Sequence, residues 1–197
     1  HRYESLVRFN MDDFDESPYE AITYAEETGR IHEFDIAMVH KVVEWLNTKP
    51  RNSDKYRVAV NISGNSVDKP EYVTALHKLL RENIWLKDKL MFEITESARM
   101  RDLESANDFI QSLRKQGYHV CLDDFGAGAA SFQYLSTLEV DVVKLDGSAI
   151  ANAQKWHKGK AFLSALADLC EKMGVETIAE WIENDTDFNF VKECGID

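Results

Sequence analysis

Apolar residues follow two spacings in turn along this chain. Six short apolar runs have the length of strands, and the segments between them repeat apolar residues every three or four positions, as amphipathic helices do. The predicted strands cover residues 1–9, 56–62, 90–95, 119–122, 140–145 and 176–179. The predicted helices cover residues 18–28, 33–47, 70–84, 103–117 and 161–173, with a short one after the glycine loop 126–128 and a last one that starts at residue 185. This alternation predicts a parallel α/β sheet, either closed as a barrel or open and doubly wound.

The size and composition of the chain favour one domain. It has 197 residues, and 44% of them are apolar, which is enough to build a full hydrophobic core. The sequence contains no internal repeat, linker or low-complexity block, so residues 1–197 are predicted to form a single domain.

The charge balance limits the classes of partner. Acidic residues outnumber basic residues by 35 to 23, the formal charge is −12, and no segment is rich in lysine and arginine. A groove for polymeric nucleic acid is therefore not expected. A small phosphorylated ligand is compatible with this charge if bound metal neutralises it.

The cysteines and the hydropathy indicate the cellular setting. Cys121, Cys170 and Cys194 are odd in number and form no C-x-x-C pair, and two of them lie in apolar patterns, so a reducing compartment is favoured. No apolar segment approaches the ~18–20 residues of a membrane span, and no signal peptide is visible. We expect the chain to be cytoplasmic, either alone or as the cytoplasmic part of a membrane-anchored protein.

Polar side chains stand at the ends of all six predicted strands. They are Glu4, Asn61, Glu93, Asp123, Asp124, Lys144 and Glu180. In a barrel the carboxyl ends of the strands converge on one mouth, so these side chains are expected to face one another. Buried adjacent carboxylates are costly unless a positive charge lies between them, and oxygen-only ligands suit Mg²⁺ or Mn²⁺. Two such ions about 3.5–4 Å apart can activate a water for attack on a phosphate ester, and a lysine beside that water can orient it.

Each of these residues also has an ordinary structural interpretation. Asp123 and Asp124 are compatible with a helix-capping turn and Asn61 with an Asx turn. Lys144 is compatible with snorkelling to solvent or with a pair to any neighbouring acid. A glutamate at a strand end is more often solvated than catalytic. The joint occurrence on six successive strands favours a shared site. Other motifs are weak, because Gly126-Ala127-Gly128 lacks a dinucleotide fingerprint and the chain has no H-E-x-x-H and no G-x-S-x-G.

The strand-end residues lie in short motifs that resemble those of the EAL domain family, the cyclic-di-GMP phosphodiesterases of bacterial signalling. The resemblance covers the whole chain with the motifs in order. The matching segments are Glu4-Ser5-Leu6-Val7-Arg8, Ala25-Glu26-Glu27-Thr28-Gly29, Asn61-Ile62-Ser63, Glu93-Ile94-Thr95-Glu96, Asp123-Asp124-Phe125-Gly126, Lys144-Leu145-Asp146 and Ala179-Glu180-Trp181-Ile182-Glu183.

The resemblance implies a fold and a set of roles. The fold would be a TIM-like (βα)8 barrel with one reversed strand near its start. Glu4, Asn61, Glu93 and Asp123 would hold a first Mg²⁺ or Mn²⁺ ion, and Asp124 would serve mainly a second. Lys144 and Glu180 would act at the attacking water, with Glu180 as base or metal partner and Glu4 also needed for catalysis. The remaining implied roles are a loop tether for Glu96, a phosphate contact for Arg8, and substrate contacts for Leu6 and Asp146. The product would be the linear dinucleotide pGpG.

The sequence also departs from the family pattern. Ser5 replaces an alanine, Ala127 and Ala129 replace a threonine and a tyrosine of the loop, Trp181 replaces a glycine, and Gly147 stands where arginine is common. Parts of the first and last strands are also expected to be missing, which gives a trimmed barrel. These departures motivate an alternative, a cyclic-di-GMP receptor with little or no turnover. A scaffold that has lost the nucleotide is a weaker third interpretation, because Arg8 and every metal-ligand type are present. The resemblance further implies attached sensor or GGDEF-type domains and a homodimer.

Overall fold

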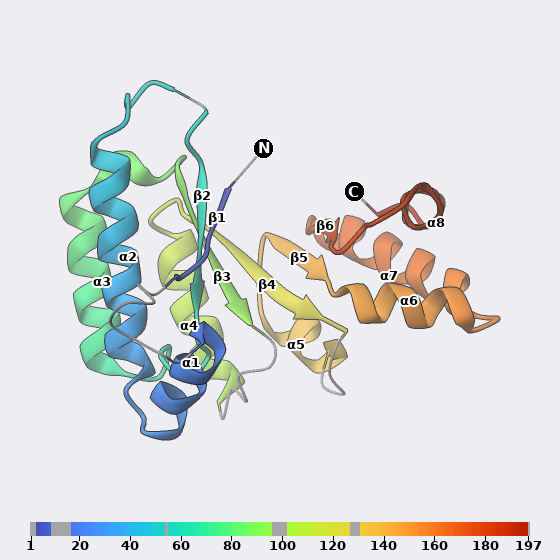
Figure 1. The fold of residues 1–197 in the computed structure, drawn as a ribbon, viewed down its shortest axis with the longest axis horizontal. Helices are drawn as coiled ribbons and strands as arrows, with labels where there is room; N and C mark the ends of the chain where they lie inside the picture. Colours follow the sequence, from blue (N-terminus) through green and yellow to red (C-terminus); the bar gives the residue numbers. More distant parts are fainter. Residues whose placement is uncertain (1–2, 9–16, 54, 96–101, 127–130, 197) are drawn as a thin grey trace.

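A six-stranded sheet runs through the molecule, in the order β1-β2-β3-β4-β5-β6 (Figure 1). The computed structural model describes residues 3–8, 17–53, 55–95, 102–126 and 131–196. The strands are β1 (Tyr3–Ser5), β2 (Val58–Ile62), β3 (Leu90–Thr95), β4 (His119–Phe125), β5 (Val142–Leu145) and β6 (Glu176–Ala179). All neighbouring strands pair in parallel, which confirms the predicted α/β class. The reversed strand that the resemblance implies is not among these six strands. The described sheet therefore forms part of a barrel and not a complete barrel of eight strands.

Helices follow the strands along the chain. They are α1 (Pro18–Glu27), α2 (Ile31–Asn47), α3 (Pro70–Glu82), the 3-10 turn η1 (Ile84–Leu86), α4 (Leu103–Arg114), α5 (Ser131–Thr137), α6 (Gly147–Lys155), α7 (Gly159–Met173) and α8 (Asp185–Glu193). Figure 1 shows α1–α4 gathered at one end of the sheet and α6–α8 at the other, beyond β5.

Local sequence explains where most of these helices begin. Ser17 accepts a hydrogen bond from the backbone of Glu20, whose side chain accepts one from the backbone of Ser17, and Pro18 follows as the first helical residue. The pattern failed to predict α6, which Asp146 caps through the backbone N–H of Ser148. The predicted helix 70–84 was also too long, because α3 ends at Glu82 and Ile84, which begins η1, is 63% exposed.

The two faces of the sheet bury different kinds of side chain. Alternate residues such as Val60, Phe92 and Leu122 belong to the main hydrophobic core, which the helices share. The other face carries a small apolar cluster of Ala59, Met91, Cys121 and Val142, with Ile178 packed against it. Because strand side chains alternate in direction, the residues two positions beyond this cluster continue the same face toward the carboxyl ends of the strands.

The structure describes all three cysteines and the helices that could be tested as membrane spans. Cys121, Cys170 and Cys194 are buried free thiols. Within the described ranges, the helices are all too short or too polar to cross a membrane.

Candidate metal centre

The face of the sheet that carries the small apolar cluster, called the inner face from here on, also carries the strand-end polar residues. Asn61 is in register with Glu93, and Glu93 with Cys121, so Asp123 lies two residues further along β4, opposite Thr95. Lys144 is in register with Ile178, two residues before Glu180. The residues of the inner apolar cluster, Ala59, Met91, Cys121, Val142 and Ile178, each precede one of these polar residues by two positions. The alternation of the strands therefore turns Asn61, Glu93, Asp123, Lys144 and Glu180 to the same face.

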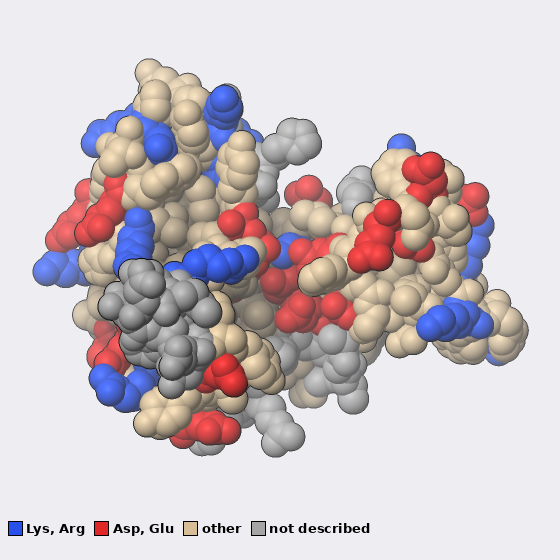
Figure 2. All heavy atoms as spheres, in the orientation of Figure 1, with Lys and Arg blue, Asp and Glu red and all other residues tan. Residues whose placement is uncertain are grey.

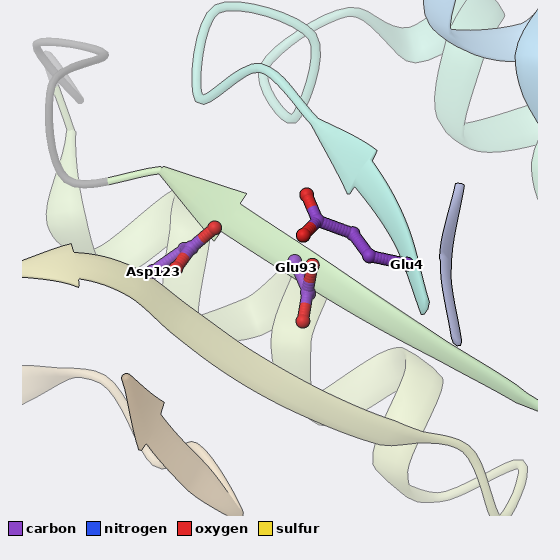
Figure 3. A group of neighbouring side chains, drawn as sticks. All are labelled: Glu4, Glu93 and Asp123. Carbon is purple, nitrogen blue, oxygen red and sulfur yellow. The ribbon is translucent and has the colours of Figure 1, made fainter. Parts of the chain in front are cut away.

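A first group of three carboxylates meets there. Glu4 on β1, Glu93 on β3 and Asp123 on β4 each offer an oxygen atom, and these atoms all lie within 4.8 Å of one another. Figure 3 shows the three side chains approaching one another from different strands. The amide Nδ2 of Asn61 donates a hydrogen bond of 2.9 Å to Oε1 of Glu4, which ties the exposed Glu4 to the sheet. Glu93 and Asp123 are only 2% and 6% exposed.

A second group shares Asp123 and depends on an irregularity of β4. The pairing between β4 and β5 advances three residues on β4, from Leu122 to Phe125, but two on β5, so one residue of β4 is extra. At this bulge Asp124 has a positive φ of 55°, a conformation that aspartate tolerates better than most residues, and its N–H donates to Oδ1 of Asp123 at 3.0 Å. In a regular strand Asp124 would point away from Asp123. Here Asp123, Asp124 and Glu180 bring oxygen atoms within 4.8 Å of one another.

Lys144 supplies the positive charge between the two groups. Its Nζ lies 2.7 Å from Oε1 of Glu180, 3.1 Å from Oδ1 of Asp123 and 3.3 Å from Oε1 of Glu93. Burial alone would lower the pKa of Lys144, but the hydrogen bond to Glu180 and the charges of Glu93 and Asp123 outweigh it and raise that pKa, so the ammonium stays charged.

The carboxylates are not fully compensated by this one ammonium group. Burial raises the pKa of Glu93 to about 7, against the favourable charge of Lys144 and with added repulsion from Asp123 and Glu4. Burial and the charges of Asp123, Asp146 and Glu180 raise the pKa of Asp124 to about 6. Burial also raises the pKa of Glu180, although the hydrogen bond from Lys144 opposes this. The oxygen Oε2 of Glu93 is buried and accepts no hydrogen bond from any described residue.

This donor set fits divalent cations. Five carboxylates against one ammonium leave four formal negative charges, which two divalent ions would balance. All the donors are oxygen atoms, which suits Mg²⁺ or Mn²⁺. The unsatisfied Oε2 of Glu93 is an acceptor that a cation would satisfy. Figure 2 shows acidic side chains gathered in the hollow between the two ends of the molecule.

The structure decides between the alternative interpretations of single residues. Asp123 lies inside β4 and Asp124 at its bulge, so neither caps a helix. Asn61 lies in β2 and bonds Glu4 rather than forming a turn. The side chain of Lys144 is buried and pairs with three acids, so it does not snorkel to solvent, whereas the interpretation as a partner of neighbouring acids holds.

Other predicted residues lie outside this cluster or are not described. Leu6 is 56% exposed, and Arg8 is exposed and donates to the carbonyl oxygen of Val7 at 2.7 Å. Asp146 caps α6 through Ser148, and its charge also reaches Asp124. Glu96 and the loop alanines 127 and 129 fall outside the described residues.

Sequence reasoning missed a buried polar cluster behind β2. Asp35 on α2 is 4% exposed and accepts hydrogen bonds from the N–H of Ser63 at 2.9 Å and from Oγ of Ser66 at 2.6 Å. Oγ of Ser63 in turn donates to Glu26 at 2.8 Å. Ser63 follows Asn61 by two residues, so these bonds hold the end of the strand that carries Asn61. A lone aspartate inside an apolar helical pattern, as in Phe34-Asp35-Ile36, was the available signal.

Comparisons with known proteins agree with this geometry. A family model described as "EAL domain" matches residues 1–197. The chain is 32% identical over 180 residues to the cyclic di-GMP phosphodiesterase PdeB of Shewanella oneidensis, covering 91% of this chain and 21% of that protein. It is 30% identical over 183 residues to the cyclic di-GMP phosphodiesterase PdeR of Escherichia coli K12, covering 91% of this chain and 27% of that protein.

A solved structure matches along the entire chain. The EAL domain of Xanthomonas citri FimX, in complex with c-diGMP, superposes with a TM-score of 0.84 at 22% identity, covering 100% of this chain and 78% of that one. This match confirms the predicted barrel type of fold. The chain spans about a quarter of the length of the curated relatives that it matches.

Proposed function

The chain belongs to the EAL domain family, and we propose that it is a divalent-metal-dependent phosphodiesterase that opens cyclic di-GMP to the linear dinucleotide pGpG. The names of the relatives from Shewanella oneidensis and Escherichia coli support this substrate. The observation that carries the proposal is the pair of carboxylate groups that share Asp123, with Lys144 between them. One shared ligand and two further acids on either side suit two neighbouring cations.

The ligand roles follow from these positions. Glu4, Asn61, Glu93 and Asp123 would hold one ion, and Asp124 with Glu180 the other, with Asp123 shared. Such ions, Mg²⁺ or Mn²⁺, would lower the pKa of a water molecule and neutralise the phosphodiester. Before they bind, the four uncompensated negative charges would repel the anionic nucleotide, so cation binding is expected to precede or accompany substrate binding.

Lys144 and Glu180 are the groups that would act at the attacking water. The 2.7 Å contact between them holds Lys144 next to Glu180, which belongs to the second carboxylate group. Burial raises the pKa of Glu180, which makes its carboxylate a stronger base than that of an ordinary glutamate. Lys144 keeps its charge and can stabilise negative charge that develops on the phosphate oxygens.

The alternative is a receptor that binds cyclic di-GMP with little or no turnover. Trp181 favours it, because this bulky residue directly follows Glu180 and has a positive φ of 56°. A small displacement of Glu180 would slow the chemistry without abolishing binding.

Turnover of cyclic di-GMP separates the two functions. Purified protein with Mn²⁺ or Mg²⁺ is incubated with the nucleotide, and the linear product is measured by liquid chromatography. We expect product in wild type, none in Glu4→Ala because ion binding is lost, and a larger loss of rate than of affinity in Glu180→Gln. Glu171→Gln, an exposed position on α7, is the matched control. Binding without product in wild type would refute the enzyme and leave the receptor.

The wider context of the chain is also a proposal. Because the chain spans only 21% and 27% of the two curated relatives, we propose that it works beside sensor or GGDEF-type domains in a longer protein. A homodimer and a cytoplasmic location remain predictions from the sequence.

A further inference from the structure

Trp181 is placed unusually for a large apolar residue. It is 73% exposed, and it follows Glu180 directly. Its φ of 56° lies in the left-handed region, where a bulky side chain is strained. Among the described residues, Asp124 and Trp181 are the only non-glycine residues with positive φ. Asp124 belongs to the carboxylate cluster, and Trp181 directly follows Glu180 of that cluster. Residues with strained backbone conformations often cluster at functional sites, so two of them at the same carboxylate cluster indicate a functional constraint.

Gly147 makes this placement of Trp181 possible. A Cβ atom at position 147 would lie 2.6 Å from Cβ of Trp181, 3.1 Å from its Cγ and 3.2 Å from its Cδ1. Real Cβ atoms essentially never approach a neighbour as closely as 2.6 Å, so any other residue at position 147 would force Trp181 to shift. Gly147 is the first residue of α6, directly after Asp146, where a helix does not need a glycine. The two departures from the family pattern therefore form one sterically matched pair.

The indole borders a cavity beside the carboxylate cluster. This cavity, of about 390 Å³, lies between α6 and α8, and Asp146, Gly147, Trp181 and Glu183 are among the residues that line it. Its volume falls within the ~300–1,000 Å³ of small-molecule sites. Two lining residues connect the cavity to the cluster along the chain, because Asp146 directly follows β5, which carries Lys144, and Trp181 directly follows Glu180.

Within the described part of the chain, the carboxylate of Glu183 is exposed and takes part in none of the hydrogen bonds or ion pairs. Asp187, by contrast, already accepts bonds from Gln154 and Asn184. The rim therefore offers a flat aromatic surface next to a free acceptor. A guanine base has a flat π-face and, on one edge, two neighbouring N–H donors, which match that pair of features.

We propose that Trp181 is a stacking platform for one guanine base of the cyclic dinucleotide, and that Gly147 is the residue that leaves room for it. This inference rests on the proposed function, since it assigns a base of the proposed substrate to the rim beside Glu180. Stacking of a base on an aromatic side chain strengthens binding by about five- to a hundredfold.

A double-mutant cycle tests the pair. The dissociation constant of cyclic di-GMP is measured by calorimetry with Mn²⁺ in a Glu180→Gln background, which keeps the nucleotide intact. Trp181→Gly and Gly147→Ala are each expected to weaken binding at least fivefold, and the double variant to be no weaker than Trp181→Gly alone. Trp181→Phe should retain most of the affinity. The Mn²⁺ affinity should be the same in all variants, and the thermal stability of Trp181→Gly should not fall, because glycine relieves the strained φ.

The outcomes also separate this inference from the proposed function. Unchanged nucleotide affinity in Trp181→Gly overturns the platform, whether or not the wild-type protein makes linear product. Additive losses from Trp181→Gly and Gly147→Ala overturn the role of Gly147. Weaker binding in Trp181→Gly, in a protein whose wild-type form releases no product, supports the platform and overturns the enzyme.

Discussion

Replacing Glu93 by glutamine should stabilise the protein when no divalent ion is bound. Burial raises the pKa of Glu93 from 4.5 to about 7. One pKa unit corresponds to about 1.4 kcal/mol, so keeping this carboxylate ionised in the folded state costs roughly 3 kcal/mol. Glutamine has the same shape and the same neighbours as the protonated acid but no charge to bury, so the variant avoids this cost.

The gain in Glu93→Gln should depend on pH in a defined direction. The unfolded chain releases the proton of Glu93 near pH 4.5, whereas the folded protein releases it only near pH 7. The free energy of unfolding of wild type therefore falls as pH rises through this interval and changes little from this group above it. We expect the variant to be more stable than wild type by roughly 3 kcal/mol at pH 9 and by less than about 1 kcal/mol at pH 5.

Urea unfolding at pH 5 and pH 9 in the presence of EDTA measures both differences. Glu82→Gln, an exposed position on α3, controls for the change of residue type. Addition of Mn²⁺ should reverse the order at pH 9, because wild type gains binding free energy that the variant lacks a carboxylate to provide. A gain of the same size at both pH values, or no gain at pH 9, would refute the reasoning about burial.

Three further results are expected. Lys144→Met should lower the free energy of unfolding in EDTA by about 3–5 kcal/mol, because it leaves the buried carboxylates of Glu93 and Asp123 without their positive partner. A loss below about 1 kcal/mol in urea unfolding would contradict this. The Mn²⁺ dissociation constant, measured by calorimetry, should rise roughly tenfold from pH 8 to pH 6. The reason is that Glu93 and Asp124, with pKa values of about 7 and 6, must lose their protons to bind an ion. A dissociation constant that does not change with pH would exclude both residues as ligands. Asp35→Ala should cost about 1–3 kcal/mol in urea unfolding, because the N–H of Ser63 and the hydroxyl of Ser66 lose their acceptor, and an unchanged midpoint would show that solvent replaces it.

The inner-face cluster could be predicted because strand periodicity is a local property. Asn61, Glu93 and Lys144 each end an apolar run, and parallel strands place their carboxyl ends at one edge whatever the details of the fold. The strand Leu90–Thr95 was predicted with the bounds that the structure has, since Leu90, Met91, Phe92 and Ile94 form an almost continuous apolar run. These features need no knowledge of residues distant in the sequence.

The features that the pattern could not predict depend on pairing between distant segments. The bulge that turns Asp124 toward Asp123 arises from the register between β4 and β5, which no single strand encodes. The sequence pattern did not predict helix α6, because Ile150 is its one large apolar residue and its other signal was the capping residue Asp146. The resemblance assigns a substrate contact to the same residue, and that role stays a prediction beside the capping role that the structure shows.

The buried charges and the strained backbone positions of this fold lie close together in space. The carboxyls of Glu93 and Asp124 have raised pKa values, and the backbones of Asp124 and Trp181 have positive φ, each at the same end of the sheet. The other end of the inner face is filled by the small apolar cluster around Met91 and Cys121. Replacing buried ionic groups by apolar residues of similar volume often stabilises a protein, so stability alone does not account for the charged end. A bound cation and a stacked base would each relieve or offset one of these costs, which is the arrangement that a binding site requires.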